Sequence, residues 1–128
     1  MNQRDRKWKW LNEDLEKLIK ENDFFGIGNI YYEMANFLKE EGKDNTRLLE
    51  LGYEIKLKFQ KERLKEFSRS EVCTGVEVIS AGDNSCEACK KLNGKIFLIK
   101  EAYSRRPLPV KNCSQECGCR CVYGPVCD

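Results

Sequence analysis

Apolar residues recur at intervals of three and four throughout the first 70 residues of the chain, and this period predicts amphipathic helices. The first stripe consists of Trp8, Leu11, Leu15, Leu18 and Ile19, and the second of Ile27, Ile30, Tyr31, Met34, Phe37 and Leu38. A third, longer helix is predicted to end near Phe67, with one apolar face of Leu48, Leu51, Ile55 and Phe59 and a neighbouring face of Leu49, Tyr53, Leu57 and Leu64. This wide apolar arc predicts that the third helix packs against both others.

Turn residues separate the predicted helices. Gly42 suits the C-cap of the second helix, and Asp44 or Asn45 suits the N-cap of the third. Because short connections favour antiparallel neighbours, residues 1–69 are predicted to form a helical domain, a three-helix antiparallel bundle. Its stripes are interpreted as core, whereas Trp10 lies off the main face of the first helix and is a candidate for contact with a protein partner.

The pattern changes in residues 70–128, which read as strand and loop. Residues 72–79 are rich in β-branched side chains and predict a strand. The Asn93-Gly94 pair is a strong hairpin signal, with residues 95–99 as the returning strand. The prolines of residues 106–110 predict an extended segment, and residues 120–123 a last short strand. The predicted fold class is therefore α+β: a helical domain followed by a small zinc-stabilised β-hairpin module.

The distribution of the cysteines supports the same division between residues 1–69 and 70–128, since all 8 lie in the segment from Cys73 to Cys127. The amino-terminal MNQRDRKWKW is charged and has no apolar signal-peptide region, and no run of residues is long and apolar enough to span a membrane. We therefore expect a cytoplasmic protein, in which thiols stay reduced and cysteine clusters point to metal or redox chemistry rather than to disulfides.

The spacing of the cysteines predicts a metal site. Cys86 and Cys89 form a CxxC pair, from which two thiolates can reach one ion, and a second group follows at Cys113, Cys119 and Cys121. Tetrahedral zinc sites are built from two such groups, and zinc suits an all-sulfur, redox-silent site. We expect Cys86, Cys89, Cys113 and Cys119 to bind one Zn²⁺, with Cys121 as a substitute for either of the last two.

The cysteine spacing leaves other roles for these residues open. An iron–sulfur cluster also takes four thiolates, and a second zinc ion would draw on Cys117, Cys121 and Cys127. A thioredoxin-like CxxC is disfavoured, because a turn and a hairpin are predicted after it where a redox motif begins a helix. Cys73, in the predicted first strand, is interpreted as a small buried apolar residue.

Residues 75–126 carry a longer motif. It contains Asp83, the CxxC pair, the Leu92-x-Gly94-Lys95-x-Phe97 hairpin, Pro107, Pro109 and the terminal Cys119-Arg120-Cys121. This motif resembles the C-terminal motif of phage Mu-type head-morphogenesis (minor capsid) proteins and related bacterial proteins. That family usually has a histidine shortly before the final CRC, and here Cys113 or Cys117 would take its place. The resemblance implies a small zinc-stabilised module and covers none of the helical half.

The amino-acid composition restricts the classes of function that the chain is expected to have. The chain has no histidine, the usual general acid–base residue near neutral pH, and a set of cysteines predicts a closed structural site rather than an open catalytic one. We therefore expect a non-enzymatic, zinc-binding interaction module with a protein partner. The alternative is a zinc-dependent nucleic-acid-binding protein.

That alternative has mixed support. Basic residues are interleaved with Phe97, Tyr103 and Tyr123 in the second half, as in surfaces that track a nucleic-acid backbone and stack bases. The basic residues are Lys90, Lys91, Lys95, Arg105, Arg106, Lys111 and Arg120. However, the net charge is only +2, which disfavours a partner bound through its phosphates.

Overall fold

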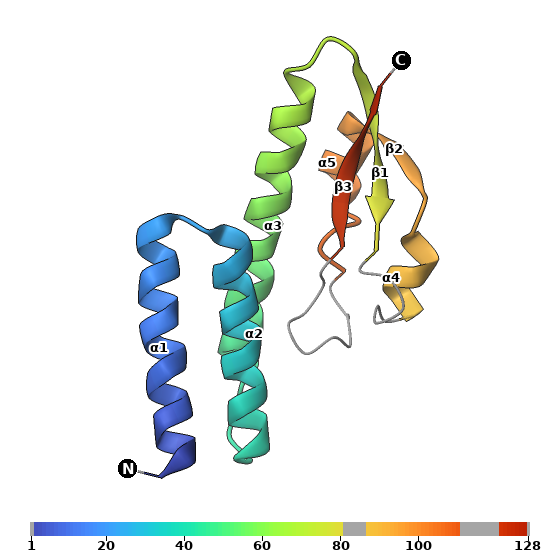
Figure 1. The fold of residues 1–128 in the computed structure, drawn as a ribbon. Coiled ribbons are helices and arrows are strands. Elements are labelled where there is room, and N and C mark those ends of the chain that lie inside the picture. Colours follow the sequence, from blue (N-terminus) through green and yellow to red (C-terminus); the bar gives the residue numbers. More distant parts are fainter. Residues whose placement is uncertain (1, 81–86, 111–120, 128) are drawn as a thin grey trace. The chain divides into compact units, whose positions relative to one another are not determined.

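The computed structural model describes residues 2–80, 87–110 and 121–127, and combines helices with a three-stranded antiparallel sheet (Figure 1). The helices are α1 (Gln3–Glu21), α2 (Phe24–Glu40), α3 (Thr46–Ser68), α4 (Glu87–Leu92) and α5 (Ile99–Arg105), and the strands are β1 (Cys73–Ile79), β2 (Ile96–Leu98) and β3 (Val122–Cys127). The predicted α+β class and the helices of the amino-terminal half are confirmed.

Among the described residues, the chain forms two compact units, one of residues 2–56 and one of residues 57–110 and 121–127. Helix α3 contributes to both units. The sequence-based boundary between residues 69 and 70 follows the end of α3, and as a domain boundary it stays a prediction.

In the first unit, α1 and α2 are joined by a tight connection. Asn22 ends α1 in the left-handed conformation, and its backbone N–H donates to the carbonyl groups of Leu18 and Ile19. The next residue, Asp23, caps α2 by accepting a hydrogen bond from the backbone N–H of Gly26 at 3.0 Å. Since both helix ends have their hydrogen-bond partners within a few residues, the chain reverses at once and the two helices are antiparallel.

The predicted stripes of α1 and α2 form the core of this unit. Its buried residues are Leu11, Ile30, Met34 and Phe37, and the Trp8 and Phe37 rings lie 5.2 Å apart. Trp10 is 55% exposed, as predicted from its position off the stripe. Ile19 was assigned to the stripe but is 49% exposed, so the predicted stripe is not buried along its whole length.

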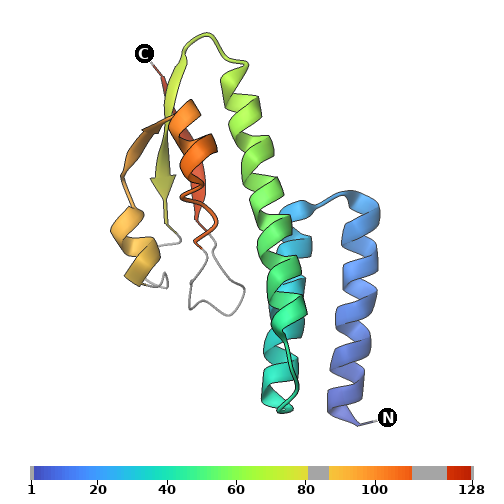
Figure 2. The same ribbon diagram turned by 180° about the vertical axis from the view of Figure 1, so that it is seen from behind.

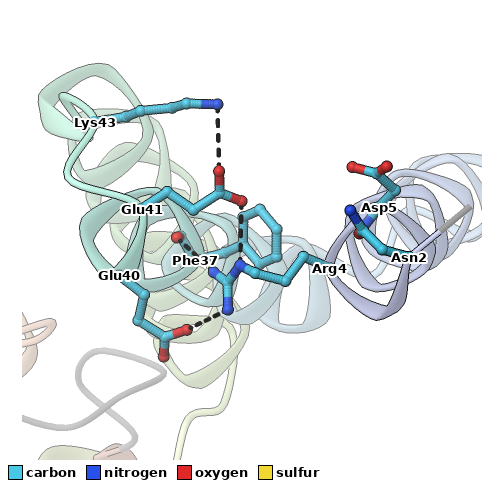
Figure 3. A network of polar contacts seen from close by, with 7 residues as sticks. All are labelled: Asn2, Arg4, Asp5, Phe37, Glu40, Glu41 and Lys43. Carbon is cyan, nitrogen blue, oxygen red and sulfur yellow. Dashed lines mark hydrogen bonds and ion pairs between the residues drawn. The ribbon is translucent and has the colours of Figure 1, made fainter.

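Arg4 ties the start of α1 to the end of α2 (Figure 3). Its guanidinium lies 4.3 Å from the centre of the Phe37 ring, donates to the Phe37 carbonyl, and forms ion pairs with Glu40 and Glu41 at 3.2 and 3.3 Å. Burial opposes ionisation of Glu41, but hydrogen bonds and charge from Arg4 and Lys43 outweigh it and hold the pKa of Glu41 below its usual value.

The most buried side of α3 consists of Gly52, Lys56, Gln60 and Leu64, at four-residue spacing. Of these, only Leu64 belongs to a predicted apolar face, and the other predicted leucines are half-buried or exposed. Lys56 occupies this side because Gly28 leaves room for its alkyl chain: a Cβ atom at Gly28 would lie 2.5 Å from Lys56 Cγ. The Lys56 ammonium lies over the Phe25 and Tyr32 rings, at 5.4 and 5.0 Å from their centres. A long amphipathic side chain can therefore hold a core position that a simple apolar pattern misses.

In the second unit, the sheet has the strand order β2-β1-β3, and both pairings are antiparallel. Val76 and Val78 of β1 are fully buried on one face, which α5 covers, as Figure 2 shows from behind. The register pairs Val76 with Phe97 and Val78 with Tyr123, so these rings join the same core. The predicted first strand and the returning strand are confirmed, although the returning strand ends at Leu98.

Two short helices, α4 and α5, were not predicted. The run of residues 95–99 read as strand, but Glu101 reaches back to accept a hydrogen bond from the Leu98 N–H at 3.1 Å, and this cap begins α5. At the other end, Arg106 adopts the left-handed conformation and its N–H donates to Ala102 O at 3.0 Å. Arg106 therefore closes the helix and is not extended as the sequence predicted, because the end of the helix outweighs the preference of a residue before proline.

Candidate metal centre

Cys89, the second cysteine of the CxxC pair, is buried on α4 with 1% of its surface exposed. The end of α4 is fixed to the end of β1 by the turn that follows it. Gly94 has a positive φ of 82° and its N–H donates to Val78 O at 2.8 Å, while the Asn93 side chain accepts from the Ser80 N–H at 3.0 Å. The Asn93-Gly94 signal therefore marks a real turn, and that turn positions α4 against the sheet.

Cys121 comes directly before β3 and is also 1% exposed. Its backbone carbonyl accepts a hydrogen bond from the Gln60 side-chain amide at 2.9 Å. Two residues further on, the buried Tyr123 hydroxyl accepts from the Leu108 N–H at 3.3 Å. Because these bonds are buried, they hold the first residues of β3 to α3 and to the segment after α5.

The sheet register brings both cysteines to one end of β1. Ile79 pairs with Val122 in the last pair at this end of the ladder, and Cys121 directly precedes Val122 in the sequence. Ser80 is in turn held by Asn93, four residues after Cys89. Cys89 and Cys121 belong to one cluster of buried side chains together with Val78 and Tyr123. The structure thus gathers one member of each cysteine group at one end of the sheet.

Cys86, Cys113 and Cys119, the other predicted ligands, lie outside the described residues. Within the described ranges, no three cysteine, aspartate or glutamate side chains are gathered closely enough to hold a metal ion. Thiolate donors suit Zn²⁺, which is bound by sulfur at four-coordinate structural sites. Since a buried thiolate is costly without a compensating charge, the apolar surroundings of Cys89 and Cys121 suit either neutral thiols or thiolates that bind a cation. The two described residues therefore fit half of a sulfur site.

A helix follows the CxxC pair, contrary to the predicted turn and hairpin. Cys89 lies in the first turn of α4, and the turn at Gly94 comes after that helix. The arrangement of the strands still disfavours a thioredoxin-like motif. β2 returns antiparallel to β1, whereas a thioredoxin-like motif sits in a βαβ unit with parallel strands.

The exposure of aromatic residues on the second unit indicates which of them could contact a partner. Tyr123, one of the aromatic residues interleaved with basic ones, is buried, and Phe97 packs against the core, so Tyr123 is not available to stack on a base. Tyr103 is exposed and lies in a groove of about 420 Å³ between α3 and α5. Leu64, Ile99 and Tyr103 provide its apolar surface, and Lys65, Lys100, Ser68 and Ser104 also line it.

Comparisons of the chain with protein-family models, with curated proteins and with solved structures found no match. The resemblance to the zinc module of head-morphogenesis proteins therefore rests on the sequence motif alone. No helix in the described part of the chain is long and apolar enough to cross a membrane.

Proposed function

We propose that this chain is a cytoplasmic, non-enzymatic interaction module whose second unit is stabilised by one structural zinc ion bound by cysteine. The observation that supports it best is the position of Cys89 and Cys121, which come from the two cysteine groups and are buried in one cluster at one end of the sheet. Cys86 and two of Cys113, Cys119 and Cys121 would complete a four-sulfur set with Cys89. Zinc bound there would cross-link segments far apart in sequence and so contribute directly to folding.

The test is metal-dependent folding. Removal of metal by a chelator is expected to abolish the tertiary structure of the second unit. The NMR signals of Tyr103 and Tyr123 report this loss, and re-addition of zinc should restore them. Serine at Cys86 or Cys89 should have the same effect as chelation. Serine at Cys73, at the far end of β1, is the matched control and should leave the metal bound. A second unit that stays folded after complete removal of metal would refute the proposal.

The side chains that line the groove between α3 and α5 indicate which chemical groups a protein partner would present to it. Lys61 Nζ lies 6.0 Å from the centre of the Tyr103 ring, so three lysines, with Lys65 and Lys100, surround the apolar surface. Only Glu62, which pairs with Lys65 at 3.5 Å, is an acidic group in contact with these lysines among the ion pairs of the described residues. We therefore propose that the partner presents an acidic segment with an apolar side chain, which enters the groove between the lysines.

A synthetic peptide with a central leucine flanked by glutamates tests this proposal, alongside the same peptide with lysines. The acidic peptide should bind, and reversal of charge at Lys65 and Lys100 should abolish binding. Reversal at Lys90 and Lys91, exposed on α4, changes the net charge equally and should leave binding unchanged. If both double variants weaken binding equally, or if both peptides bind alike, the groove is not the recognition site. Salt-dependent binding of random oligonucleotides instead would favour the nucleic-acid alternative.

A further inference from the structure

Cys73 and Cys127 lie opposite each other in the sheet. Cys73 is the first residue of β1 and Cys127 the last of β3, and the antiparallel register makes their Cα atoms partners. Nothing in the sequence pattern pairs them, since Cys73 was interpreted as a buried apolar residue and Cys127 was a candidate ligand of a second ion. The pairing follows from the fold.

The position of this pair suits a cross-strand disulfide. Residues directly opposite in an antiparallel ladder have Cα atoms about 4.5–5.5 Å apart, within the range of about 4.4–6.8 Å that a disulfide spans. Their side chains also leave the same face of the sheet. A register irregularity between Cys73 and Gly75 interrupts the ladder beside the pair, so the backbone there is less tightly held than in a regular ladder.

This pair is separate from the candidate metal centre. Cys73 is half-buried and Cys127 exposed, whereas Cys89 and Cys121 are buried. From Cys73 to Ile79 the strand rises by about 20 Å at about 3.3 Å per residue, so the pair lies a strand length from the Ile79–Val122 end of the ladder. Cys73 and Cys127 therefore cannot share an ion with Cys89 and Cys121, but reagents in solution can reach Cys127.

We propose that Cys73 and Cys127 are a redox-responsive pair that forms a cross-strand disulfide when a low-molecular-weight disulfide, such as oxidised glutathione, is present. Cys127, the exposed member, loses its proton and its thiolate attacks one sulfur of oxidised glutathione. This forms a mixed disulfide and expels one glutathione thiolate. The Cys73 thiolate then attacks the Cys127 sulfur and expels the second glutathione thiolate. The two protein thiols are oxidised, oxidised glutathione is reduced to two molecules of glutathione, and the two protons pass to them.

The consequence is a covalent connection between the start of β1 and the end of β3. In the thiol form, Cys73 Sγ donates only a weak hydrogen bond to the Gly75 carbonyl, at 3.3 Å. A disulfide between Cys73 and Cys127 closes a loop that begins at the first residue of β1 and ends at the last residue of β3, and it removes conformations from the unfolded chain. The oxidised protein should therefore melt at a higher temperature than the reduced one, and glutathione or another thiol should reverse the change.

The experiment uses the full chain with its metal bound. The protein is equilibrated with oxidised glutathione, remaining thiols are alkylated, and peptides are mapped by mass spectrometry while zinc release is followed with a chromogenic chelator. We expect the Cys73 and Cys127 peptides to be joined, with the bound metal unchanged. In the Cys73→Ser variant, Cys127 should accumulate as the glutathione adduct.

Two results would overturn the proposal. One is a glutathione adduct at Cys127 that persists in the unaltered protein to the same extent as in Cys73→Ser, since Cys73 would then not resolve it. The other is a disulfide that joins either residue to a different cysteine. The proposal does not depend on the zinc site: joined Cys73 and Cys127 peptides in a protein that holds no metal would support it while refuting the proposed function.

Discussion

The Gln60 side-chain amide donates to the backbone carbonyl of Cys121 at 2.9 Å, and this buried hydrogen bond joins α3 to the start of β3 across 61 positions of sequence. The same side chain leaves its Oε1 atom buried without a hydrogen-bond partner in the described part of the chain. Gln60 therefore contributes to the second unit chiefly through one donor, which fixes the backbone of a candidate zinc ligand.

Replacement of Gln60 by leucine should destabilise the second unit. The change keeps an apolar stem but leaves the Cys121 carbonyl without its donor, and an unmet buried group costs about 1–3 kcal/mol. Denaturant unfolding should show a lower midpoint with an unchanged slope, and the affinity for zinc should fall with it. Glu62→Leu on the exposed side of α3 is the control and should change the free energy of unfolding by less than about 1 kcal/mol. Equal effects of the two variants would refute this role of Gln60.

Replacement of Gly28 by alanine should destabilise the first unit, although alanine is the better helix former by about 1 kcal/mol. The added Cβ atom would lie 2.5 Å from Lys56 Cγ, so α2 or the Lys56 side chain must shift. Overpacking of this kind costs about 1–3 kcal/mol.

A double-mutant cycle with Lys56→Ala separates this contact from other effects. When the Lys56 side chain is shortened, Gly28→Ala should become neutral or stabilising. If alanine at Gly28 costs the same in both backgrounds, the contact with Lys56 is not the cause.

Removal of the Arg4 side chain should raise the pKa of Glu41 toward its ordinary value of 4.5. In the intact protein this pKa is lowered, so the folded state binds the proton less well than the unfolded state does. The stability that Glu41 contributes is therefore fully present above pH 4.5 and is lost as the pH falls through the lowered pKa.

NMR titration of the Glu41 carboxyl carbon in Arg4→Gln measures this change directly. Lys9→Gln, which removes an exposed ion pair with Glu13 on the same helix, is the control and should leave the Glu41 titration unchanged. A Glu41 pKa that is the same in Arg4→Gln and in the unaltered protein would contradict the network in Figure 3.

The elements that the sequence predicts best are those with a long apolar period. α1, α2 and β1 follow from side chains that repeat with the geometry of one helix face or one strand. α4 and α5 are too short to carry such a period. α5 depends on a capping contact between Glu101 and Leu98, and the spacing of Ile99, Ala102 and Tyr103 with an acidic residue in the first turn is the signal that could have found it.

Two further features could not be predicted from the sequence, because they depend on contacts between residues far apart in the chain. The buried side of α3 includes Lys56 and Gln60, whose polar ends are placed on aromatic rings and on a backbone carbonyl that lie far away in sequence. The position of Cys73 opposite Cys127 depends on the register of a sheet whose strands are separated by two helices and a third strand. By contrast, the spacing of the cysteines selected Cys89 as a ligand and Cys121 as a substitute ligand, and both are buried in one cluster. That they belong to one metal site stays a prediction.

The most direct test of the zinc site is the metal content of the full chain purified without added metal, with accessible thiols counted in the same sample. We predict close to one zinc ion per chain, with about four thiols shielded from alkylation until the protein is denatured in the presence of a chelator. A protein that contains no metal, or one in which Cys89 and Cys121 react as readily as Cys127, would contradict a structural zinc site in the second unit.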